Sequence, residues 1–172
     1  MISHKIPIFE QPASMPIPQS SVTRDVLSDG SVWLRAGPCS FHYERLKPGI
    51  VLMTIQGNDV GQFGPATVDE VAAEFSRVTQ PLRLFVDTRA ATGPARQVME
   101  TWTEWFAANR ARLEDVVILV SPESQLLHLT VSIARHLSRT GGLIRICGDL
   151  NEFQSAIRST VPDYVVRPLQ PV

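Results

Sequence analysis

The chain of 172 residues has the length of one domain and is long enough to bury one substantial hydrophobic core. Hydrophobic residues make up 44% and charged residues 19% of it, a composition typical of globular rather than disordered proteins. Lys and Arg number 16 and Asp and Glu 17, which gives a net charge of -1. Binding to nucleic-acid phosphates requires a basic surplus, so this balance argues against a nucleic-acid partner.

The cysteines and the hydropathy pattern indicate a cytoplasmic protein. Cys39 and Cys147 lie far apart among apolar neighbours, which favours two buried free thiols and a reducing compartment over a disulfide. No apolar run approaches the ~18 residues that a membrane span requires. The first residues also lack the apolar core of a signal peptide.

Proline-rich segments flank the centre of the chain. Residues 1–30 contain repeated prolines, which interrupt helices and central strands, so an extended N-terminal arm is expected. Residues 162–172 have a similar composition and predict an extended tail. The predicted domain therefore spans residues 31–161. An arm laid against a second copy of the chain would make the protein a homodimer.

The first predicted elements of the domain are two strands. Residues 31–46 alternate in places between apolar and polar side chains, and Gly37-Pro38 is expected to interrupt or bend the pairing. Lys47-Pro48-Gly49 is typical of a hairpin turn, because Pro presets one turn dihedral and Gly permits a positive φ. The turn leads into residues 50–56, so the two strands are expected to pair antiparallel.

A helix–strand unit follows the loop of residues 57–66. Thr67 and Glu70 have the spacing of a capping box and predict a helix start. Apolar residues then recur at helical spacing as far as residue 78. Pro81 ends the unit. Leu82–Val86 is almost wholly apolar, as expected for a parallel strand that is covered on both faces.

Three more helices are predicted in the rest of the chain. The second starts near Thr92-Gly93-Pro94 and leads to a strand at residues 116–120. The third starts after Ser121-Pro122 and leads to a strand at residues 143–147. Asp149, with Glu152 three residues on, predicts the start of the last helix. Short apolar strands that alternate with amphipathic helices favour an α/β fold: a mixed, mostly parallel sheet with an N-terminal antiparallel hairpin and about four helices.

This order of elements resembles the STAS superfamily, which includes sulfate transporters and anti-sigma-factor antagonists. The resemblance covers about residues 32–160 and is mainly topological. Its best local piece is Leu82-Arg-Leu-Phe-Val-Asp87, a buried strand that ends in an acidic residue. Similarity to the stand-alone antagonists implies a bacterial, non-enzymatic regulatory module that binds a protein partner and carries no cofactor.

The resemblance places the interaction site in the loop after that strand, at Asp87, Thr88, Arg89 and Thr92. Antagonists of the family are switched by phosphorylation of the serine in an Asp-Ser pair, and this sequence contains no such pair. Thr88 and Thr92 are the nearest hydroxyls. A phosphate at a helix N-terminus is well stabilised, but a simple N-cap role accounts for Thr92 and is the favoured interpretation. The usual phosphoserine switch is therefore expected to be missing.

The second predicted helix has a wide aromatic stripe with one polar residue in it. Asn109 projects near the middle of the stripe that holds Trp102 and Trp105, where an unpaired amide would cost about 1–3 kcal/mol. A hydrogen bond to a strand end or to the N-terminal arm would satisfy it. Alternatively, this face meets a partner or a small apolar ligand. Tryptophan stripes usually belong to the core, and we favour that interpretation.

The residues that most often carry chemistry do not form a site that the sequence can identify. His128 and His136 lie roughly 80° apart around the predicted helix axis, so neither a metal pair nor a metal site is expected. Cys39 lies near His42, but no third group is available to orient a nucleophile. The glycines of the loop at residues 57–66 match no phosphate-binding motif.

Three functions fit these observations, and we favour the first. It is a non-enzymatic interaction module of STAS type that binds a regulator or its own copy. The second is a protein that binds a small apolar or lipid-like molecule, which predicts an apolar cavity near Trp102. The third is a hydrolase or transferase, which requires Asp59, Asp87 and a histidine in one cleft.

Overall fold

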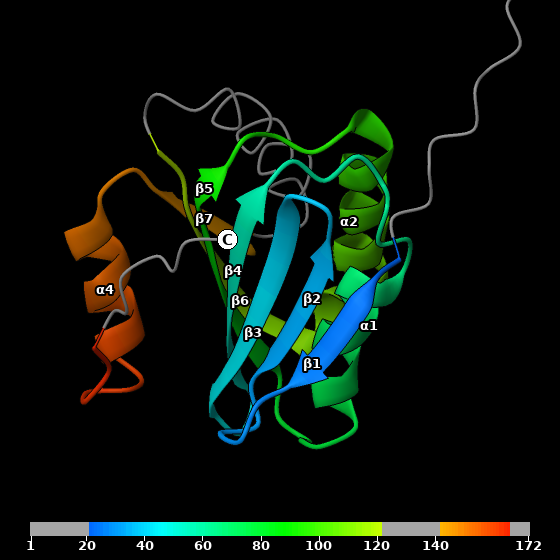
Figure 1. Ribbon diagram of the computed structural model, residues 1–172. Coiled ribbons are helices and arrows are strands. Elements are labelled where there is room, and N and C mark those ends of the chain that lie inside the picture. The colour runs from blue at the N-terminus through cyan, green and yellow to red at the C-terminus, as the bar shows by residue number, and fades with distance from the viewer. Residues whose placement is uncertain (1–20, 122–141, 166–172) are drawn as a thin grey trace, which may run out of the picture.

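The computed structural model describes residues 21–121 and 142–165 of the chain (Figure 1). The predicted third helix, its two histidines and most of the N-terminal arm lie outside the described residues. So does the greater part of the predicted C-terminal tail.

The described residues form one mixed sheet of seven strands, whose order in space is their order in the sequence. The first four strands pair antiparallel, and the fourth to the seventh pair parallel. The predicted α/β class and mixed sheet with an antiparallel N-terminal part are thereby confirmed, and three of the six strand pairings are parallel and three antiparallel. The strands are β1 (Thr23–Val26), β2 (Val32–Ala36), β3 (Cys39–Lys47), β4 (Ile50–Gly57), β5 (Leu82–Ala91), β6 (Leu113–Leu119) and β7 (Ile144–Cys147).

Helices cover both faces of the sheet (Figure 1). α1 (Ala66–Phe75) and α2 (Arg96–Ala108) pack on one face, and a short 3-10 turn at Arg110–Arg112 follows α2. α4 (Leu150–Arg158) packs on the opposite face. Its predicted start is confirmed, because the Asp149 side chain accepts a hydrogen bond from the Asn151 amide at 3.0 Å.

The N-terminal part of the sheet is larger than the sequence predicts. β1 lies inside the segment that we expected to be an arm, and it forms the edge of the sheet beside β2. All of its residues are exposed, so it lacks the apolar alternation by which strands are recognised. Gly37-Pro38 does more than bend the chain. It forms a complete turn between β2 and β3, with Gly37 at φ 57°.

The predicted capping box of α1 is wrong. The N-cap lies two residues earlier than predicted, at Pro65, which makes no side-chain cap, and the helix begins at Ala66. Thr67 is buried, and its carbonyl accepts a hydrogen bond from the Tyr43 hydroxyl at 2.9 Å. Glu70 forms an ion pair with Arg24 of β1. The two residues therefore attach α1 to the sheet and do not close its first turn.

The core has two parts, one on each face of the sheet. The larger lies between the sheet and the helices α1 and α2, and it includes Phe41, Leu84 and Val116. The smaller lies beneath α4, where the rings of Phe85 and Phe153 meet edge to face with centroids 6.0 Å apart. Cys39 and Cys147 are both buried free thiols, as predicted.

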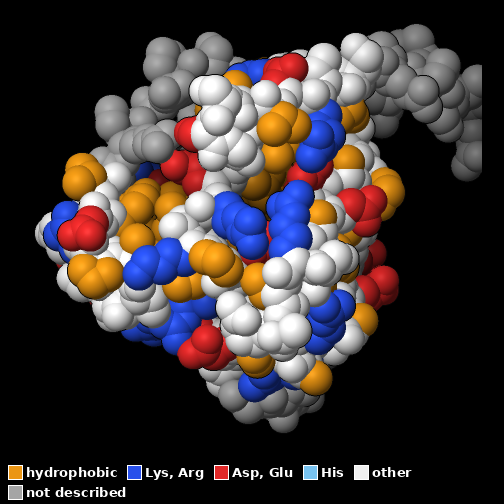
Figure 2. All heavy atoms as spheres, turned by 90° about the horizontal axis from the view of Figure 1, so that it is seen from below, with side chains coloured by type: hydrophobic (Ala, Val, Ile, Leu, Met, Phe, Trp, Pro, Cys, Tyr) orange, Lys and Arg blue, Asp and Glu red, His pale blue; other side chains and the backbone are white. Residues whose placement is uncertain are grey.

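Basic and acidic side chains lie close together on the end of the molecule that Figure 2 shows. Arg45 and Arg77 both contact Glu74, and Arg83 pairs with Glu114. This mixture agrees with the net charge of -1. No helix among the described residues is both long and apolar enough to cross a membrane.

Candidate functional site

The segment that we expected to be a loop after the buried strand is a continuation of β5. The strand runs on from Val86 through Ala91. It pairs with β4 as far as Gly57 opposite Ala91, and Asp87 lies beside Thr54. Asp87, Thr88 and Arg89 are thus strand residues at the carboxyl ends of two parallel strands. In open α/β sheets, ligands bind beyond this edge.

Asp87 and Arg89 form a fixed ion pair on the face of the sheet that α4 also covers. Residues two apart in a strand point to the same face, and the Arg89 guanidinium is bidentate on Asp87, with Nη2–Oδ2 at 2.7 Å and Nε–Oδ1 at 3.0 Å. Asp87 is buried, whereas the Arg89 side chain is 24% exposed. The hydrogen bonds to Asp87 raise the pKa of Arg89 above its usual value. The guanidinium is therefore a positive charge in a fixed position at the sheet edge.

The two threonines of the predicted site differ in accessibility. Thr88 is buried, and its hydroxyl donates to the carbonyl oxygen of Leu119 at 2.8 Å. Thr92 is exposed, and its backbone amide donates to the carbonyl oxygen of Gly57 at 2.9 Å. The expected N-cap role of Thr92 is wrong, because the N-cap of α2 is Ala95, three residues further on, and the helix begins at Arg96. Pro94, expected in the first turn, also precedes the helix.

The aromatic stripe of α2 belongs to the core, which is the interpretation that we favoured from the sequence. Trp102 is buried, and Trp105 is half-buried and stacks on Phe75 with ring centroids 5.7 Å apart. The amide of Asn109 donates to the carbonyl oxygen of Trp105 at 2.8 Å. Asn109 is the C-cap of α2, so its amide closes the helix end and does not reach a strand end.

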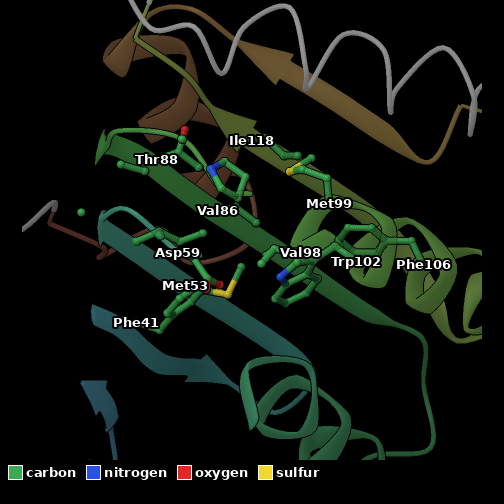
Figure 3. Close-up of a pocket in the computed structure, with 15 residues that line it drawn as sticks. Phe41, Met53, Asp59, Val86, Thr88, Val98, Met99, Trp102, Phe106 and Ile118 are labelled. Atoms are coloured by element: carbon green, nitrogen blue, oxygen red, sulfur yellow. The ribbon is translucent and has the colours of Figure 1, made fainter. Parts of the chain in front are cut away.

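An apolar pocket of about 90 Å³ lies between the sheet and α2 (Figure 3). Side chains from β3, β4, β5 and β6 form one wall and side chains from α2 the other, and Figure 3 shows them directed into the space between. Its apolar lining includes the side chains of Phe41, Met53, Val86, Val98, Trp102 and Ile118. A cavity beside Trp102 is the feature that the ligand-binding hypothesis predicts.

Asp59 is a buried carboxylate in the wall of this pocket, a position that was not predicted from the sequence. Its relative exposure is 4%. Among the described residues, one hydrogen bond to its side chain is found, from the Gly61 amide to Oδ1 at 2.9 Å. Burial raises the pKa of Asp59, and the Gly61 amide partly opposes this shift. Burial, together with the charge of Asp59, raises the pKa of the Cys39 thiol to about 12.

The loop that carries Asp59 is tied to the start of α2. The Asp59 carbonyl oxygen accepts from the amide of Ala95 at 2.7 Å, and the side chain of Gln97 donates to the carbonyl oxygen of Val60 at 3.1 Å. These contacts connect residues nearly 40 positions apart in the chain. Sequence spacing gives no sign of them. The one available signal was the position of Asp59 just after an apolar strand.

The residues required by the hydrolase or transferase hypothesis are not brought together. Asp59 lies on the side of the sheet that faces α2, with Val86 in the same pocket wall. Asp87 directly follows Val86 in β5, so its side chain points to the opposite side of the sheet. His42 is aligned with Thr54, which lies between it and Asp87 in the sheet. Within the described part of the chain, no group of three His, Cys, Asp or Glu side chains could hold a metal ion.

Comparison with solved structures returns matches of low sequence identity. An anti-sigma factor antagonist from Mycobacterium paratuberculosis matches with 14% identity and a TM-score of 0.46, over 84% of this chain and 99% of that one. An uncharacterized protein with a SpoIIAA-like fold from Shewanella loihica matches with 10% identity and a TM-score of 0.48, over 79% and 91%. No family model and no curated protein matches the chain. At these identities and TM-scores, the two matches assign neither a family nor a residue role to this chain.

Proposed function

We propose that this protein is a non-enzymatic regulatory module of STAS type that binds a protein partner at the end of β5. The observation that supports this role best is the Asp87–Arg89 pair. Because Asp87 holds the guanidinium in two hydrogen bonds, little side-chain freedom is lost when a partner binds it. A partly exposed arginine in a fixed position is also among the side chains that contribute most to interfaces.

Thr92 marks the accessible side of this interaction site. It is exposed three residues beyond Arg89, on the segment that connects β5 to α2. Thr88 donates its hydroxyl to Leu119 and is buried. If a hydroxyl of this segment is phosphorylated, it is therefore that of Thr92. The partner is either a separate regulator or a second copy of the chain.

A substitution pair at exposed threonines tests the interaction site. Thr92→Arg adds bulk and charge where the partner is expected to bind, and Thr101→Arg makes the same change on the exposed side of α2. Affinity capture from the native cell extract, with phosphosite mapping of the eluate, identifies the retained protein. The affinity of this retained protein for each purified variant is then measured by calorimetry. We expect Thr92→Arg to weaken binding at least tenfold and Thr101→Arg to leave it unchanged. Equal binding by both variants would contradict the proposal.

A second copy of the chain as the partner is tested in solution. Sedimentation equilibrium of the full-length protein over a wide dilution range is expected to show a monomer–dimer transition if the protein binds itself, and Thr92→Arg is expected to shift it towards monomer. A single monomer mass at all concentrations would exclude self-association and leave a separate regulator as the partner.

Binding of a small apolar molecule is a second candidate function, which the pocket beside Trp102 supports. Its volume of about 90 Å³ is below the roughly 150 Å³ of a protein cavity that accepts benzene. The pocket thus suits a small molecule better than a lipid-like chain. This function is compatible with partner binding, because Arg89 and Thr92 of the interaction site do not line the pocket.

A further inference from the structure

The pocket between the sheet and α2 has a polar side chain that its apolar lining does not explain. The relative exposure of Asp59 is only 4%. Asp59 lines the pocket together with Met53 and Trp102 (Figure 3). Taking a carboxylate out of water is unfavourable unless it is paired or well hydrogen-bonded. The single amide bond from Gly61 compensates part of this desolvation. An apolar pocket with a few convergent polar groups is the usual form of a small-ligand site.

Two oxygen-bearing side chains that line this pocket are hydrogen-bond acceptors, whereas the indole N–H of Trp102, which also lines it, is a donor. The carboxylate of Asp59 accepts in its ionised form. The hydroxyl of Thr88 also lines the pocket, but its proton is already donated to the Leu119 carbonyl oxygen, so it too can only accept. A ligand that satisfies both groups must therefore bring its own donors. An anionic ligand would place a second negative charge beside Asp59 and is disfavoured.

The remaining wall sets the size and shape of the ligand. Phe41, Met53 and Ile118 offer apolar contact from the sheet, and the ring of Trp102 does so from α2. A cavity of about 90 Å³ is smaller than the roughly 150 Å³ of a protein cavity that accepts benzene, so it suits a group of only a few carbon atoms. Methionine adapts to ligands of different shape, so a linear or a branched short chain would fit.

We propose that this pocket binds a small aliphatic primary amine, with the ammonium group on Asp59 and the alkyl chain between the sheet and α2. This assignment rests on the second candidate function and names its ligand class. It does not depend on the interaction site at Arg89. An ammonium group supplies three donors and a compensating positive charge, and the alkyl chain replaces water at an apolar surface.

The pocket also borders the segment that leads to Thr92. Ala91 and Gly93, its neighbours on both sides, line the pocket, as does Pro94. A bound amine would contact the inner side of the segment whose outer side carries Thr92. Occupancy of the pocket can thus alter partner binding, provided that the amine favours one conformation of this segment.

The test is a titration of the full-length, isotope-labelled protein with n-butylammonium, followed by amide and methyl NMR. The neutral n-butanol and the anionic n-butyrate serve as probes of the same chain length. We expect saturable shifts for n-butylammonium at Asp59, Thr88 and Trp102. The affinity for n-butanol is expected to be at least tenfold weaker, and no saturable shifts are expected for n-butyrate.

Substitutions then assign the charge recognition to Asp59. Asp59→Asn keeps the shape of the side chain and its acceptor for Gly61, and it is expected to weaken n-butylammonium binding at least tenfold. Glu104→Gln removes one negative charge from an exposed position on α2 and is expected to leave binding unchanged. The titration of the unsubstituted protein decides the matter by itself if Asp59→Asn does not fold.

The possible outcomes separate the amine assignment from the pocket function. Equal affinities for n-butanol and n-butylammonium would overturn the amine assignment and leave a site for small apolar molecules. Equal n-butylammonium binding by Asp59→Asn and the unsubstituted protein would also overturn it. Shifts confined to residues away from the pocket, or no saturable shift with any probe, would overturn both the amine assignment and the second candidate function.

Discussion

Asp59 shows how one side chain can couple stability to pH. Its carboxylate is buried among apolar side chains, and burial raises its pKa from the ordinary value of 3.8. The folded chain therefore holds this proton more tightly than the unfolded chain does. It follows that the contribution of Asp59 to stability is most favourable below about pH 3.8 and is lost as the pH rises through the raised, folded-state pKa.

We expect Asp59→Asn to stabilise the ligand-free protein near neutral pH. The amide is never ionised, so the unfavourable burial of a charge is removed, for a gain on the order of 1 kcal/mol. The gain should shrink as the pH is lowered towards 4, because Asp59 itself then becomes neutral. Urea unfolding at a series of pH values measures it. The exposed Glu104→Gln controls for the lost charge and should shift stability by less than about 0.5 kcal/mol. A pH-independent gain, or a loss near neutral pH, would contradict this account.

Single residues were predicted from the sequence to the extent that local rules place them. The Asp149 cap was predicted correctly because it depends on the next two residues. Asp87 and Arg89 were named as candidates, but their ion pair was not anticipated, since we expected the strand to end at Val86. Asp59 was named only as a residue that the hydrolase or transferase hypothesis requires, because its place in the pocket depends on α2, far along the chain.

At the scale of elements, the end of β4 is fixed by a glycine that no other residue can replace without strain. Gly57 has φ 77°, and a Cβ there would lie 2.3 Å from the carbonyl oxygen of Pro38. Its own carbonyl oxygen accepts the hydrogen bond from the Thr92 amide. Gly57 therefore allows the β2–β3 turn, the end of β4 and the segment after β5 to approach one another.

We expect Gly57→Ala to destabilise the protein by at least about 2 kcal/mol, because it combines a left-handed backbone with a clash against backbone atoms. Gly30→Ala is the matched control. Its φ is 81°, but a Cβ there meets nothing within 4 Å, so it should cost about 1 kcal/mol. Thermal and urea unfolding of the two variants measure the difference. Equal losses would show that the contact with Pro38 relaxes freely.

The elements themselves were predicted best where an apolar pattern is strong. The strands on both sides of α2 and the start of α4 were found because apolar runs and a local cap define them. β1 was missed because it is short and exposed and is held by pairing with β2. The end of β5 was misplaced because its last residues are polar or small and are kept extended by the partner strand β4.

For the whole molecule, each strand lies beside its neighbour in the sequence, and this order in space was predicted only for the pairing of the first two expected strands. Hairpins and right-handed crossovers are the simplest connections that produce such an order. The distribution of helices was not predicted. α1 and α2 pack on one face and α4 on the other, and the choice of face depends on which strand residues each helix meets. The pocket exists on the face of α1 and α2, so it could not be derived from the order of elements.

The two parts of the core share one sheet, so we expect them to unfold as a single unit. Phe153→Ala removes the ring that packs on Phe85 beneath α4 and should cost about 3–5 kcal/mol. Trp102 and Trp105 lie on the other face, so in a Trp33→Phe background, which removes the third tryptophan, fluorescence reports on a region that Phe153→Ala does not touch. For a cooperative domain, fluorescence and far-ultraviolet circular dichroism should shift to the same lower urea midpoint. Val26→Ala, an exposed change on β1, should leave both midpoints unchanged. If circular dichroism shifted while tryptophan fluorescence did not, α4 would unfold independently and the sheet would not couple its two faces.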